Sequence, residues 1–147
     1  MQLSFVKRTG KNDELTIVRN TGVVETIACP KQRIIPHDMG HYAVESILGH
    51  QGFLSLVEDG AAANFAAIGG DSAEAIERLV ETFQAEMWGG RVSAIDLLAT
   101  YEHACAARCH PVVAVSVADV TAIRERLDEL TELWTSLPVN EALTFEF

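Results

Sequence analysis

Hydrophobic and polar residues alternate loosely along the first thirty residues of the chain, and this period of two is typical of β-strands. The segments QLSFVKR and ELTIVRN are rich in β-branched and aromatic residues, and RNTG reads as a turn before VVETI. We therefore expect an antiparallel meander of strands over residues 2–8, 14–19 and 23–28.

The spacing of the apolar residues changes to a helical period after Pro36, which suits a first helical turn, and Gly49 suits a helix end. Ser116 and Asp119 form a loose capping box before the last apolar stripe, which consists of Val120, Ile123, Leu127, Leu130 and Trp134. The Gly- and Ala-rich interval 51–70 is interpreted as a loop or a helical turn. Four helices are predicted, over residues 37–48, 72–88, 92–108 and from 117 onward.

The tail EALTFEF returns to alternation, with Leu143, Phe145 and Phe147 on one side, and is expected to form a strand that joins the N-terminal sheet. The fold class predicted from these patterns is α+β, with the meander and the C-terminal strand in one sheet that packs against about four helices.

The chain has 147 residues, of which 48% are hydrophobic and 22% are charged, as is typical of one folded domain. We expect a single domain over residues 1–147. The first residues contain no apolar segment of the signal-peptide type, and no apolar run approaches the length that crosses a bilayer. Three cysteines, an odd number, argue against a secreted disulfide framework, so a cytoplasmic location is expected.

The formal net charge is −10, and residues 71–147 carry five Lys/Arg against fourteen Asp/Glu. A surface of this sign repels phosphate backbones and anionic lipids. The sequence therefore predicts no nucleic-acid or membrane partner.

The candidate chemistry is concentrated in RIIPHDMGHYAVESILGH, which holds three of the five histidines. His37 and His41 are four residues apart, so on a helix both imidazoles can reach one cation. Glu45 lies a further turn along, about 12 Å of helix rise from His37. It is expected to hold His41 in orientation rather than to share the ion. The alternative is an ordinary helix whose Asp38 interacts with the helix dipole.

The order His37-Asp38-Met39-Gly40-His41 resembles the HExxH helix of zincin-type metallohydrolases, with Asp where that family has Glu. The resemblance implies that His37 and His41 bind zinc or another divalent metal and that Asp38 activates the metal-bound water. The segment is also similar to PHDxxHxxVE segments of small bacterial proteins with no assigned activity, and this second similarity implies no function.

A catalytic zinc takes three protein ligands, so a third must come from elsewhere in the chain. The apolar stripe predicted for the 92–108 helix consists of Ile95, Leu98, Ala99, Cys105, Ala106 and Cys109. Glu102 lies in the middle of this stripe, where an unpaired carboxylate would be costly. Its place on a second, downstream helix resembles the gluzincin arrangement, which makes Glu102 the candidate third ligand. The alternative is that Glu102 turns to the surface or pairs with Arg91 or Arg108.

Three functions follow from these patterns, of which the third and weakest is a metal sensor or carrier. The first is a small zinc-dependent hydrolase of the peptidase or amidase kind, with His37, His41 and Glu102 as ligands and Asp38 as the base. The second is a non-catalytic domain without metal that associates through the apolar segment GFLSLV and the alternating tail, for example as a homodimer. The substrate is not encoded in these spacings.

Overall fold

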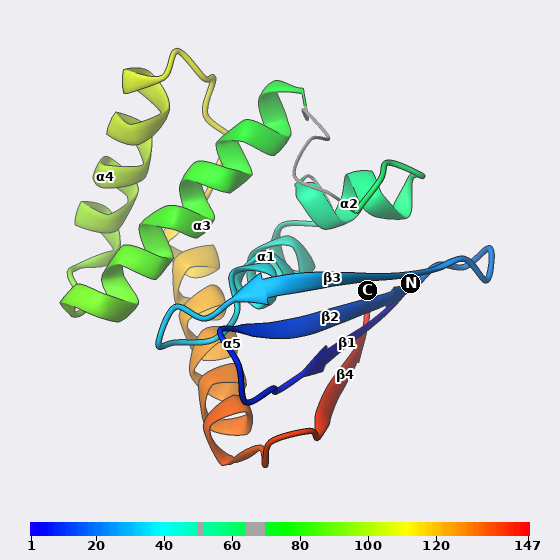
Figure 1. The fold of residues 1–147 in the computed structure, drawn as a ribbon. Helices are drawn as coiled ribbons and strands as arrows, with labels where there is room; N and C mark the ends of the chain where they lie inside the picture. Colours follow the sequence, from blue (N-terminus) through cyan, green and yellow to red (C-terminus); the bar gives the residue numbers. More distant parts are fainter. Residues whose placement is uncertain (50–51, 64–69) are drawn as a thin grey trace.

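The computed structural model describes residues 1–49, 52–63 and 70–147 and has the predicted α+β architecture (Figure 1). Its sheet is antiparallel, with the strand order β3-β2-β1-β4. The C-terminal strand pairs with the first strand, as the alternating tail predicts. The strands are β1 (Gln2–Val6), β2 (Asn12–Val18), β3 (Val24–Pro30) and β4 (Ala142–Glu146).

One face of the sheet carries the core. Leu3 and Phe5 of β1 lie opposite Ile17 and Leu15 of β2, and all four side chains are fully buried. The residues between them along each strand point to the other face and are partly exposed. This register places the apolar half of each alternation against the helices, and burial of each such side chain contributes about 1.5–3 kcal/mol.

The helices are α1 (His37–Leu48), α2 (Phe53–Glu58), α3 (Asp71–Gly89), α4 (Ala94–Ala107) and α5 (Val117–Ser136). Helix α1 has the predicted bounds and is the central helix, because it contacts α2, α3 and α5 (Figure 1). Gly49 ends α1 in the left-handed conformation, with φ 76°. Helix α2 lies within the interval interpreted as a loop or helical turn; residues 51 and 64–69 of that interval lie outside the described residues.

The capping box predicted for the last helix is confirmed. The backbone N–H of Asp119 donates to Ser116 Oγ at 3.1 Å, and the backbone N–H of Ser116 donates to Asp119 Oδ2 at 2.8 Å. The predicted stripe of α5 is also confirmed, since all its members are buried. These residues are Val120, Ile123, Leu127, Leu130 and Trp134.

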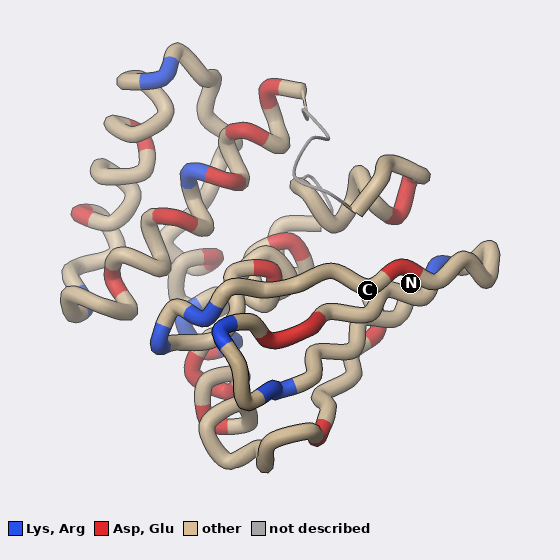
Figure 2. Tube along the Cα trace, viewed as in Figure 1, with Lys and Arg blue, Asp and Glu red and all other residues tan. Residues whose placement is uncertain are grey.

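Charge is unevenly placed on the fold. Acidic residues are spread along the helices, whereas several Lys and Arg residues gather near one end of the sheet (Figure 2). Among the described residues, no helix is both long and apolar enough to cross a membrane.

Candidate metal centre

Helix α1 brings two imidazoles together. His37 is its first residue and His41 lies one turn later, so the two rings stand on the same side of the helix, with centroids 4.8 Å apart. Their Nε2 atoms are 3.2 Å apart. The His41 side chain is fully buried, whereas that of His37 is 17% exposed. The Nε2 atoms of the two rings therefore face one common point.

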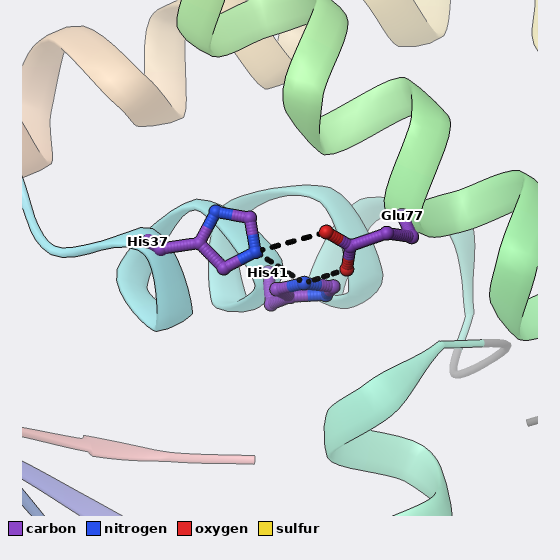
Figure 3. Close-up of side chains that lie close together, drawn as sticks. All are labelled: His37, His41 and Glu77. Carbon is purple, nitrogen blue, oxygen red and sulfur yellow. Dashed lines mark hydrogen bonds and ion pairs between the residues drawn. The ribbon is translucent and has the colours of Figure 1, made fainter. Parts of the chain in front are cut away.

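Glu77 of α3 completes the cluster (Figure 3). Its Oε1 lies 3.2 Å from His37 Nε2, and its Oε2 lies 2.9 Å from His41 Nε2. One ligand atom from each of the three residues lies within 4.8 Å of the others, so all three can reach a single ion. Among the described residues, this is the group of three or more His, Cys, Asp or Glu side chains with that geometry.

The remaining ring nitrogens are held by other side chains. The Nδ1–H of His41 donates to Glu45 Oε1 at 3.1 Å, and the Nδ1–H of His37 donates to Gln84 Oε1 at 3.0 Å. Gln84 is itself oriented, because its amide nitrogen donates to Gln32 Oε1 at 2.9 Å. With a proton fixed on each Nδ1, both Nε2 atoms face Glu77, and a cation would bind them once the proton on His41 Nε2 is released.

Glu45 lies against His41, as the sequence predicts. It is fully buried and also binds the start of α2. Its carboxylate accepts hydrogen bonds from the backbone N–H groups at the start of α2 and from a hydroxyl: Gly52 N at 3.1 Å, Leu54 N at 3.1 Å, Ser55 N at 3.0 Å and Ser55 Oγ at 2.8 Å. A Cβ on Gly52 would lie 2.5 Å from Glu45 Cδ, so only glycine permits this approach. Glu45 thus joins the start of α2 to the histidine pair.

The carboxylates around His41 favour a positive charge at the centre of the site, carried either by a proton or by a cation. Burial lowers the pKa of His41, but its hydrogen bonds to Glu45 and Glu77 outweigh burial and raise this pKa to about 9. For Glu77, burial raises the pKa, but hydrogen bonds from His37 and His41 prevail and hold it well below its usual range. In the metal-free protein an imidazolium therefore lies between two carboxylates, in a position that a divalent cation can take over.

This balance predicts the pH dependence of stability in the metal-free protein. The folded pKa of His41, about 9, exceeds the ordinary value of 6.5, so its contribution to stability is fully present below pH 6.5. That contribution is lost as the pH rises through 9. Urea unfolding of chelator-treated protein between pH 6 and 10 should show this decline, and His41→Gln should abolish it. A free energy of unfolding that stays constant over that interval would contradict the raised pKa.

Asp38 lies beside the cluster and is 2% exposed. Its Oδ2 accepts a hydrogen bond from the Cys29 thiol at 3.2 Å, and burial raises the pKa of that thiol, which keeps it neutral. Its Oδ1 is buried and has no hydrogen-bond partner among the described residues. Asp38, His37 and Glu77 all line one pocket of about 330 Å³, with Cys29 and Gln84 on its walls.

Glu102 does not join the cluster. It is exposed on α4, so the expectation that it faces the core is wrong. The helix instead buries Leu97, Tyr101 and Cys105, and Ile95 of the predicted stripe is 71% exposed. The cause is Tyr101, whose ring is buried while its hydroxyl donates to Val113 O at 3.2 Å and accepts from Val113 N at 2.9 Å. Glu102, one position later, points about 100° away from this buried face.

The sequence carries only a weak signal for Glu77. It precedes Leu79 and Val80 of the buried stripe of α3 and stands seven residues before Gln84, so both polar side chains lie along one edge of that stripe. Polar residues at the edge of an apolar stripe are common on helices. Only the packing of α3 against α1 distinguishes Glu77 from other acidic residues of α3.

Two imidazole nitrogens and a carboxylate form a ligand set suited to zinc and related first-row cations, with further coordination positions left for water or substrate. Comparison of the chain with protein-family profiles, curated proteins and solved structures finds no match.

Proposed function

We propose that the protein binds one divalent cation of the zinc type through His37 and His41 of α1 and Glu77 of α3. The observation that carries this proposal is the convergence of two Nε2 atoms and a carboxylate within 4.8 Å. Support comes from the hydrogen bonds on the far side of both rings, because ligand histidines are usually held in this way. His41 is fully buried, and the side chains of His37 and Glu77 are only 17% and 29% exposed, which limits competition from solvent.

The reaction that suits this site best is hydrolysis of a small amide or peptide-like substrate. A bound zinc lowers the pKa of its water towards 7. Asp38 would hold or accept a proton at Oδ1, beside the cluster, since this atom has no hydrogen-bond partner within the described part of the chain. The pocket of about 330 Å³ lies at the small end of the range for ligand sites, which favours a small substrate or one side chain of a larger one.

The decisive variant is Asp38→Asn, in protein produced without a His-tag. Zinc titration against a chromogenic chelator should give one ion per chain in both wild type and variant, because Asp38 is not a ligand. Hydrolysis of amino-acid p-nitroanilides should fall by about 100-fold or more in the variant, the usual contribution of a general base. Asp59→Asn, an exposed aspartate after α2, is the matched control and should change neither property.

Two outcomes would count against the proposal in different ways. Folded protein that takes up no stoichiometric zinc would reject the metal centre and favour the metal-free association domain. Zinc uptake with undiminished hydrolysis in Asp38→Asn would keep the metal centre and remove Asp38 as the base.

A further inference from the structure

The positive charge of this acidic protein is segregated in its first part. Residues 1–36 carry six Lys/Arg and three Asp/Glu, whereas residues 37–147 carry five and eighteen. The folded chain brings part of this positive charge together near one end of the sheet (Figure 2). Because exposed charges are screened over roughly 8 Å at physiological salt, the local excess determines what this region attracts.

A pocket of about 450 Å³ lies within this positive region, and we call it the basic pocket. Four cationic side chains line it, against a single carboxylate, that of Asp13. The cationic residues are Lys7, Arg8, Lys31 and Arg33. The segment 29–35 separates it from the candidate metal centre, since Lys31 and Arg33 line the basic pocket while Gln32 between them lines the other.

Three of the four cations already have partners. The Lys7 ammonium donates to the carbonyls of Trp134 at 2.5 Å and Leu137 at 2.9 Å, at the end of α5. Arg8 pairs with Glu14. Lys31 lies 3.4 Å from Asp13, which also accepts the backbone N–H of Arg8 at 2.8 Å. The one carboxylate of the lining is therefore engaged by groups other than Arg33.

Arg33 is the donor that remains. Its guanidinium makes no hydrogen bond or ion pair within residues 1–49, 52–63 and 70–147, although it has five N–H groups. Its backbone is in the left-handed region, with φ 65°, where glycine or asparagine is less strained. A planar guanidinium at the rim of a basic pocket is well suited to a carboxylate, which it can bind through two parallel hydrogen bonds.

Apart from the threonines Thr131 and Thr135, the rest of the lining is apolar. Ile34 and Ile35 follow Arg33 directly, and Trp134 and Val139 come from the end of α5 and the loop after it. Ile35 and Trp134 are buried, at 1% and 7% exposure, so they provide a firm wall. A ligand for this pocket combines an anionic group for Arg33 with an apolar body for the wall.

We infer that the basic pocket binds a small organic carboxylate with an apolar body, held by Arg33 at the rim and by Trp134 and its aliphatic neighbours inside. The inference uses none of the metal-centre residues and does not depend on the proposed function. It can be tested on chelator-treated protein, so that its failure and the failure of the metal centre are distinct results.

Calorimetric titration of the full chain with phenylacetate, acetate and inorganic phosphate tests the inference. Phenylacetate should bind at one site per chain, at least about tenfold more tightly than acetate or phosphate, because only phenylacetate also buries a ring. Arg33→Asn should weaken phenylacetate binding about tenfold or more. Asparagine tolerates the left-handed backbone, so the midpoint of thermal unfolding should not fall.

Arg108→Asn is the matched control, since it removes one exposed positive charge that does not line the basic pocket. It should leave phenylacetate affinity unchanged. The inference is overturned by a lack of saturable phenylacetate binding, or by equal binding to wild type and Arg33→Asn. It is also overturned if acetate or phosphate binds as tightly as phenylacetate, because the apolar wall would then have no role.

Discussion

Glu77→Gln is expected to weaken zinc binding by more than about 100-fold, because removing a ligand should exceed the 10–100-fold effect of removing a group that only orients one. Glutamine has nearly the same size as glutamate but lacks the charge that balances the cation. Glu102→Gln changes an exposed carboxylate on α4 and should leave zinc affinity unaltered. Competition titrations with a chelator of known affinity measure both variants.

The same pair of variants distinguishes Glu77, the third ligand that the structure suggests, from Glu102, the third ligand expected from the sequence. If Glu102→Gln weakened zinc binding and Glu77→Gln did not, the arrangement of α3 and α1 would be wrong at this point. In metal-free protein, Glu77→Gln should also lower the pKa of His41 from about 9, because Glu77 is one of the two carboxylates that raise it. An NMR titration of the His41 ring measures that shift without any metal.

Glu45→Ala is expected to cause the largest loss of stability, about 3–5 kcal/mol, the usual effect of breaking a buried ion pair. Without the carboxylate, three backbone N–H groups and the Ser55 hydroxyl at the start of α2 lose their acceptor. His41 also loses one of the two carboxylates that contact it. The midpoint of thermal unfolding should fall by roughly 6–20 °C for a chain of this length. Calorimetry or circular dichroism provides the measurement.

Glu132→Ala is the control for this effect, because Glu132 is exposed on α5 and its substitution should stay within about 0.5 kcal/mol of wild type. Equal stabilities of Glu45→Ala and Glu132→Ala would show that the link between α2 and the histidine pair is not formed in solution. Glu45→Gln should be intermediate, since its amide oxygen can still accept part of the hydrogen bonds.

Local patterns were sufficient for the strands, for every helix except α2, and for two of the three candidate ligands. The alternation around Leu3 and Leu15, the limits of α1 at Pro36 and Gly49, and the Ser116–Asp119 box all act over a few residues. The same is true of His37 and His41, whose common direction follows from one turn of a helix. These features depend on the chain only within a turn or two, so a period or a cap is enough to predict them.

The rest was decided by contacts between distant segments. Glu77 meets the histidines only because α3 packs against α1, and Glu102 is excluded because α4 turns its Tyr101 inwards to reach Val113. The basic pocket likewise requires the end of α5 to close over residues 31–35. A sequence period indicates that a helix has a buried face, but which neighbour that face meets depends on side-chain packing over the whole fold. The amino-acid sequence alone thus determined the sheet, α1 and its histidine pair, whereas tertiary packing selected the third candidate ligand and placed Arg33 at the rim of the basic pocket.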